Sequence, residues 1–287
     1  RVSFLTLYIV IIILVGNEIQ ILQGIKTWLF QTFDMKDLGE ASYILGIKIL
    51  WDRALRKLSL SQEKYIDTLL DRFHMSNCIQ GKVPYDSTKK MSQVDCPSQL
   101  KDKLDESKYP YASAVGSFMY ALMCTRPDLA YAVGVLSRFQ ANPGFTHWEG
   151  VKWVMRYLQR TKSYALTYQA DTLELISYPD LDYQKCIDTC KSTSGFIFMF
   201  GGGAISWKSK KQDYVAQSTM EAEYVAMNLA TRDTVYVRKF LRSLVVVDYV
   251  EQPISLFCDN AYAIAITKDP KSHSKAKHIE GKYHYIR

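Results

Sequence analysis

Apolar and polar positions along the chain first predict a strand-rich start. The most apolar run covers residues 4–16. It is shorter than the ~20 residues that a membrane-spanning helix needs. Its many β-branched residues, followed by Gly16 and Asn17, instead predict a buried strand or hairpin.

The middle of the chain alternates between helical and strand-like patterns. Apolar spacing predicts helices at residues 19–33, 62–73, 111–139 and 147–160, and strands at 38–50 and 57–60. Ser61 can cap the second helix, and Pro127 breaks the third and starts a new one. Residues 74–107 are polar and predict a loosely folded connector. The inward side of the last helix is expected to carry Trp148, Val151, Val154, Met155 and Leu158.

After Tyr164 the pattern changes to short strands. Residues 195–200 and 204–207 flank three glycines that supply hairpin torsions and lack the Lys-Ser/Thr of a phosphate-binding loop. Ser218 and Glu221 have the spacing of a capping box, which predicts a helix through Leu244. A strand at residues 254–259 and another helix follow.

Three carboxylates lie where these elements begin or end: Asp180 after an apolar stretch, Glu223 early in the helix, and Asp259 at the end of a strand. Each one alone is better explained as an acid exposed to solvent, an acid stabilised by the helix dipole, or a helix cap. Together, in a β-β-β-α-β-α order, they can converge on one point. Converging carboxylates repel unless a cation lies between them, so we expect Mg²⁺ (or Mn²⁺) there.

Composition permits well-packed cores. The chain has 287 residues with 48% hydrophobic and 13% aromatic content, and its first residue is Arg, so we expect a fragment of roughly two domains. The net charge of +7 permits a polyanionic partner without requiring one. Six scattered cysteines favour reduced, intracellular thiols. Cys186 and Cys190 form the one close pair, and we interpret them as two unpaired thiols in a loop.

Specific motifs run through nearly the whole chain in a fixed order. They are Met35-Lys-Asp-Leu-Gly-Glu40, Ser61-Gln-Glu-Lys-Tyr-Ile66, Tyr111-Ala-Ser-Ala-Val-Gly-Ser117, Cys124-Thr-Arg-Pro-Asp128, Asn142-Pro-Gly, Lys191-Ser-Thr-Ser-Gly195, Ser206-Trp-Lys-Ser-Lys-Lys-Gln212, Glu221-Ala-Glu-Tyr224, Cys258-Asp-Asn260 and Lys277-His-Ile279. In this order the chain resembles the Pol polyprotein of copia-type long-terminal-repeat retrotransposons, of the plant type.

The resemblance implies an α+β or α/β chain in three parts. Residues 1–85 would be the end of a reverse transcriptase (palm remnant and thumb), residues 86–169 a helical connection, and residues 170–287 a ribonuclease H-like mixed-sheet domain. In that family the acids bind two Mg²⁺ ions and cut RNA in an RNA–DNA hybrid. The family pattern assigns catalysis and metal binding to Asp180, Glu223 and Asp259, with at most a supporting role for Asp182, which should point the same way along the strand.

The chain departs from the family pattern at several positions. Val10 and Ile11 stand where the polymerase hairpin carries two aspartates, and neither can bind Mg²⁺, so we expect polymerase activity to be lost. In the other half, Pro179 removes an amide donor beside the first acid, and Tyr183 replaces Trp. The family's last strand and helix, with a fourth carboxylate, are expected beyond Arg287. Glu280 cannot replace that acid.

Two hypotheses follow, and a third is weaker. The first is a ribonuclease H-like hydrolase, in which phosphates are contacted by Lys208, Lys210, Lys211, Lys277 and His278; a solvated face explains most of these side chains equally well. The second is a decayed, non-catalytic relic that at most binds nucleic acid. The third is a thiol or zinc enzyme that uses Cys186, Cys190, His273 and His278. The spacing of these four residues along the chain does not match that of known zinc sites.

The partners expected from the resemblance are an RNA–DNA hybrid or other nucleic acid and the remainder of the Pol polyprotein, and no membrane. The compartment expected from it is intracellular, either a cytoplasmic particle or the nucleus.

Overall fold

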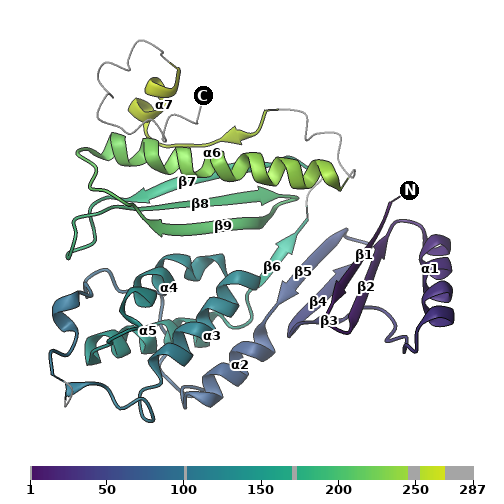
Figure 1. The fold of residues 1–287 in the computed structure, drawn as a ribbon, viewed down its shortest axis with the longest axis horizontal. Coiled ribbons are helices and arrows are strands. Elements are labelled where there is room, and N and C mark those ends of the chain that lie inside the picture. The colour runs from purple at the N-terminus through teal and green to yellow at the C-terminus, as the bar shows by residue number, and fades with distance from the viewer. Residues whose placement is uncertain (1, 100–101, 170–172, 245–252, 269–287) are drawn as a thin grey trace.

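The fold combines a strand-rich N-terminal part, a helical part and a sheet covered by one long helix (Figure 1). The computed structural model describes residues 2–99, 102–169, 173–244 and 253–268. The strands are β1 (Ser3–Tyr8), β2 (Ile11–Gly16), β3 (Tyr43–Ile44), β4 (Ile47–Asp52), β5 (Lys57–Ser61), β6 (Ala165–Tyr168), β7 (Ile176–Asp182), β8 (Thr193–Phe200), β9 (Gly203–Lys211) and β10 (Ser255–Leu256). The α-helices are α1 (Ile19–Thr32), α2 (Glu63–Arg72), α3 (Tyr111–Cys124), α4 (Ala130–Leu136), α5 (Phe145–Thr161), α6 (Thr219–Ser243) and α7 (Ala261–Lys268). Short 3₁₀ turns include η1 (Gln93–Asp95), η3 (Pro127–Leu129) and η4 (Ser137–Phe139).

The apolar start forms the predicted hairpin. Strands β1 and β2 pair antiparallel from Ser3↔Gly16 to Tyr8↔Ile11, so Ile9 and Val10 make the turn. Burial was predicted wrongly for this end, because Ile9, Val10 and Ile11 are exposed. Helix α1 packs against β2 and leaves the turn of the hairpin uncovered.

A second sheet joins distant parts of the chain. Its strand order is β3-β4-β5-β6, with antiparallel pairing throughout. The predicted strand at 38–50 is split by a tight turn, in which Leu45 and Gly46 both have positive φ. Strand β6 returns after the helices and pairs with β5, and the Ser59 and Thr167 hydroxyls lie 2.9 Å apart.

Helices α2 to α5 enclose the largest core. The predicted inward residues of α5 are all buried there, which confirms the helical pattern. Helix α2 contributes Ile66, Leu69 and Leu70 to the same cluster. The connector has no long element among its described residues, yet Tyr85 and Met91 pack against the core. The core therefore runs across residue 85, where the family resemblance implies a boundary.

Arg126 is a buried cation inside this helical part. It is 2% exposed, and it donates to both carboxylate oxygens of Asp128 and to the carbonyl and hydroxyl of Thr161 at the end of α5. Its guanidinium also lies over the rings of Tyr157 and Tyr164. The break before α4 is thereby tied to the end of α5.

The third part is a mixed sheet covered by a long helix. The strand order is β10-β7-β8-β9, with β10 parallel to β7 and the other pairs antiparallel. Helix α6 lies along β7 and β8 (Figure 1), and Phe196, Phe198, Ala230, Val237 and Leu241 form the core between them. The hairpin glycines Gly201 and Gly202 have positive φ, as predicted. The chain thus combines α-helices with several sheets, which supports the α+β class.

Two further features complete the fold. The indole nitrogen of Trp207 on β9 donates to the carbonyl of Leu122 on α3 at 3.0 Å, which ties the mixed sheet to the helical part. Within the described ranges, no helix is both long and apolar enough to cross a membrane.

Candidate metal centre

Two of the three acids are positioned by a pair of parallel strands. Ser255 of β10 lies opposite Ile176 of β7. Asp180, within β7, and Asp259, three residues after β10, follow these partners by the same four residues, so both acids lie toward the same end of the two strands. Because the carboxyl ends of parallel strands meet at one edge, the sequence order alone favours this arrangement.

The third acid, Glu223, is placed by the start of α6. The hydroxyl of Ser218 accepts from the Glu221 amide at 3.1 Å, as a capping box predicts. The reciprocal bond differs by one residue, because the Glu221 carboxylate accepts from the amide of Gln217 at 2.8 Å. Glu221 therefore takes part in capping the start of α6. Glu223, about half a turn further along the helix, is the acid expected to bind a metal.

Glu223 is a buried carboxyl with an unsatisfied oxygen. It is 8% exposed, and its Oε2 has no hydrogen-bond partner in the part of the chain that the structure describes. Burial, followed by the charges of Asp259 and Asp180, raises the pKa of Glu223 to about 7. A bound divalent cation would satisfy the buried oxygen and offset the repulsion between these carboxylates, so the donor set fits Mg²⁺.

Asp259 is not used as a helix cap. The side-chain oxygen of Asn260 accepts from the amides of Tyr262 and Ala263 at the start of α7, at 3.1 and 3.0 Å. One oxygen of Asp259, one of Glu223 and the sulfur of Cys258 all lie within 4.8 Å of one another. The sequence pointed to both acids, but it gave no sign that a thiol would join them.

Asp182 is engaged elsewhere. Strand β7 continues to it, yet its carboxylate forms an ion pair with Lys185 at 2.9 Å and a hydrogen bond with the Tyr131 side chain. Asp182 thus interacts with the helical part and with the loop that follows β7. Asp180 differs, because its negative charge contributes to the raised pKa of Glu223.

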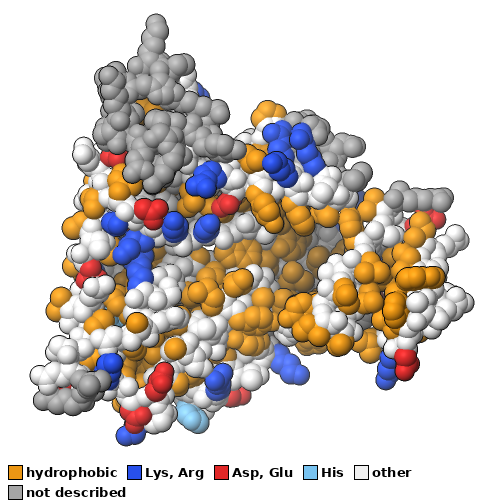
Figure 2. Space-filling view, in the orientation of Figure 1, with side chains coloured by type: hydrophobic (Ala, Val, Ile, Leu, Met, Phe, Trp, Pro, Cys, Tyr) orange, Lys and Arg blue, Asp and Glu red, His pale blue; other side chains and the backbone are white. Residues whose placement is uncertain are grey.

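The predicted phosphate-binding lysines divide between two faces of β9. Lys208 forms an ion pair with Asp233 of α6 at 3.8 Å, and Lys210 forms one with Asp213 at 3.5 Å. Lys211 lies on the other face, as strand alternation requires. On the face in Figure 2, Lys and Arg side chains gather near the boundary between the mixed sheet and the helical part. Lys277, His278 and His273 lie outside the described residues.

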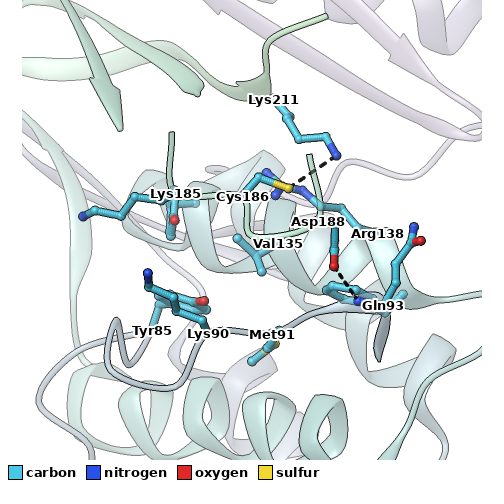
Figure 3. Close-up of a pocket in the computed structure, with 12 residues that line it drawn as sticks. Tyr85, Lys90, Met91, Gln93, Val135, Arg138, Lys185, Cys186, Asp188 and Lys211 are labelled. Carbon is cyan, nitrogen blue, oxygen red and sulfur yellow. Dashed lines mark hydrogen bonds between the residues drawn. The ribbon is translucent and has the colours of Figure 1, made fainter. Parts of the chain in front are cut away.

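A small basic pocket surrounds Cys186 (Figure 3). It has room for about one water, at about 30 Å³, and Lys90, Arg138, Lys185 and Lys211 line it. The thiol sulfur accepts from the Thr189 hydroxyl at 3.1 Å and from the Lys211 ammonium at 3.7 Å. Burial opposes ionisation, but the Thr189 hydrogen bonds and the charges of Lys211 and Arg138 outweigh it, so the pKa of Cys186 lies below its usual value.

Sequence reasoning did not identify this pocket. It correctly treated Cys186 and Cys190 as free thiols, and all six cysteines are free. No local signal marks the pocket, because Lys211 is 25 residues away along the chain and Arg138 comes from the helical part.

Comparison with known proteins gives a consistent set of relatives. A family model described as reverse transcriptase (RNA-dependent DNA polymerase) matches residues 3–87. The chain is 45% identical over 283 residues to the retrovirus-related Pol polyprotein from transposon TNT 1-94 of Nicotiana tabacum, which covers 99% of this chain and 21% of that protein. It is 33% identical over 287 residues to the Pol polyprotein from transposon RE2 of Arabidopsis thaliana, covering 100% of this chain and 19% of that protein.

A shorter relative matches over most of its own length. An uncharacterized mitochondrial protein of Arabidopsis thaliana is 33% identical over 235 residues, which are 80% of this chain and 92% of that protein. The chain spans about a fifth of the length of the two Pol polyproteins. No solved structure matches it.

Proposed function

Because the chain belongs to the Pol polyprotein family of plant copia-type retrotransposons, with a reverse transcriptase region, we propose that its mixed-sheet part is a ribonuclease H-type centre. Its substrate is the RNA strand of an RNA–DNA hybrid, and its reaction is phosphodiester hydrolysis. The remainder of the Pol polyprotein is its proposed working context.

One observation carries this proposal: Glu223 lies near Asp259, is subject to the charges of Asp259 and Asp180, and has a buried Oε2 with no hydrogen-bond partner among the described residues. Leaving a carboxylate oxygen buried without a partner is costly. Three structural acids with no cation between them would also repel one another. A cation site explains both features at once.

Asp180, Glu223 and Asp259 would hold Mg²⁺ or Mn²⁺. When bound at such a site, the ion supplies Lewis-acid stabilisation of negative charge on phosphodiester oxygens. The chain's own contribution is to hold the acids. Glu223 is fixed by burial and by the capped start of α6, and Asp180 is fixed by the sheet, with its Oδ1 accepting from the Leu181 amide at 2.8 Å.

Contacts to the hybrid are proposed for Lys208 and Lys210 on β9. Each has one long ion pair with a nearby acid and is about half exposed. Exposed pairs of this kind are weak, so a phosphate can compete for these ammonium groups.

We further propose that polymerase activity is absent. Val10 occupies the hairpin turn and Ile11 starts β2, where the family's metal-binding aspartates are expected. Aliphatic side chains offer no oxygen to Mg²⁺. This loss also favours a second candidate function, that of a non-catalytic relic whose mixed sheet at most binds nucleic acid.

A hybrid-cleavage assay with the full chain separates the two candidates. With Mg²⁺, a labelled RNA–DNA hybrid should be cut, and Asp259→Asn and Asp180→Asn should each lower the rate at least ~100-fold. Asp67→Asn is the matched control, because Asp67 is a half-exposed acid on α2 that is paired with Lys162, away from both the centre and β9. Cleavage unchanged by Asp259→Asn would overturn the assignment. A hybrid that is bound but never cut would establish the relic.

A further inference from the structure

The centre contains a ligand atom that a purely Mg²⁺ site does not need. Besides the oxygens of Glu223 and Asp259, the sulfur of Cys258 lies in the same cluster, with all three atoms within 4.8 Å of one another. The group therefore mixes two hard donors with one soft donor.

The sulfur has a defined position. It accepts from the amide of Asn260 at 3.4 Å, and Asn260 in turn caps α7. Cys258 therefore lies in a short, hydrogen-bonded connection between β10 and α7. The buried Oε2 of Glu223, which lacks a partner among the described residues, is an independent sign that a ligand belongs in the cluster.

Thiolates discriminate between cations. Mg²⁺ takes oxygen ligands, whereas Zn²⁺ and related soft ions bind thiolate sulfur at ~2.3 Å and carboxylate oxygen at ~2.0–2.2 Å. Three protein ligands with a fourth position open are a common arrangement for Zn²⁺. Only small side-chain movements would close the cluster around such an ion, and the exposed side chain of Asp259 has room to make them.

We propose that Cys258, Glu223 and Asp259 form a binding site for a soft divalent cation of the Zn²⁺ or Cd²⁺ class. Binding forms a metal–sulfur bond and releases the thiol proton to solvent. Because the site shares two carboxylates with the Mg²⁺ centre, a soft ion and Mg²⁺ compete. The competition rests on the proposed function, whereas the soft-ion site does not.

Direct binding is tested with Cd²⁺ and the full, reduced chain. The thiolate-to-cadmium charge-transfer absorbance is titrated in wild type, Cys258→Ser and Cys258→Ala, with Cys190→Ser as a matched thiol control. We expect both Cys258 variants to lose the tightest-binding component of the band, and Cys190→Ser to keep it. Asp259→Asn, which leaves the thiol in place, should weaken that component at least ~10-fold. An unchanged band in the Cys258 variants would overturn the proposal.

Competition is read separately by equilibrium dialysis of Cd²⁺ against increasing Mg²⁺. We expect the apparent affinity for the Cd²⁺ that wild type holds through Cys258 to fall as Mg²⁺ is raised through the millimolar range. If Cd²⁺ binds through Cys258 and its apparent affinity is unchanged at Mg²⁺ concentrations that support cleavage, the shared-carboxylate arrangement is wrong. A chain that binds Cd²⁺ in this way but never cuts the hybrid would contradict the proposed function and leave the soft-ion site standing.

Discussion

At the scale of single residues, the acids could be predicted because their neighbourhoods are local. Asp180, Glu223 and Asp259 stand beside strand and helix ends that periodicity and caps reveal. What could not be predicted is the environment of each side chain. The unsatisfied oxygen of Glu223, the contact of Asp182 with Tyr131 and the approach of the Cys258 sulfur to Glu223 all depend on contacts between separate elements.

The raised pKa of Glu223 predicts how stability depends on pH. The folded pKa of about 7 lies above the ordinary value of 4.5, so the folded state binds more protons between these pH values. Metal-free protein should therefore lose stability as pH rises from about 4.5 to 7, by on the order of 3 kcal/mol at most. Thermal unfolding in EDTA across this range measures the loss.

Glu223→Gln supplies the comparison for this test, because its neutral amide does not titrate. The difference in melting temperature between the variant and wild type should grow as pH rises. A difference that stays constant from pH 4.5 to 7.5 would show that folding does not raise the pKa of Glu223.

The Cys186 pocket predicts a selectively reactive thiol. The pKa of Cys186 lies below its usual value, whereas burial raises the pKa of Cys78, Cys96 and Cys124. Its alkylation by iodoacetamide, followed by peptide mass spectrometry, should reach its plateau rate at lower pH than theirs.

Two lysine variants test the cause of this reactivity. Lys211→Met removes the ammonium near the sulfur and should shift the Cys186 profile to higher pH. Lys210→Met, one residue away and paired with Asp213, should leave it unchanged. Equal profiles for the two variants would exclude Lys211 as the cause.

At the scale of elements, helices were predicted better than strands. The period of α1, α5 and α6 depends on residues within each helix, so their ranges agree closely with the expected ones. The turn at Leu45 and Gly46 was missed, because an apolar Leu with positive φ gives no turn signal. The exposure of the first hairpin was missed because burial depends on what packs against it.

The exposed turn of that hairpin predicts tolerance to charge. Val10 is 84% exposed and Ile11 is 38% exposed. The double variant Val10→Asp and Ile11→Asp should therefore change the unfolding free energy by less than about 1 kcal/mol. Leu29→Asp, at a buried position of α1, should cost several kcal/mol in the same urea titration. A cost above ~2 kcal/mol for the double variant would mean that the turn is covered.

At the scale of the whole molecule, the helical part depends on one buried cation. Arg126→Ala removes donors from Asp128 and from both oxygens of Thr161, and should destabilise the chain by about 3 kcal/mol. The exposed pair of Arg53 and Glu40 is the control, and Arg53→Ala should cost under about 1 kcal/mol. Urea midpoints followed by the helical circular dichroism signal would compare them. Equal costs would rule out a structural role for Arg126.

The pairing of β6 with β5 was beyond sequence reasoning, because nothing local to residues 165–168 selects a partner strand so far away. Ser59 and Thr167 are separated by 108 positions, so their pairing closes a loop with an entropic cost of roughly 4 kcal/mol. That cost falls once α2 to α5 have assembled and hold the loop ends near each other. On a ribosome, the second sheet therefore stays open at β5 until the helices have emerged, and β6 completes it late.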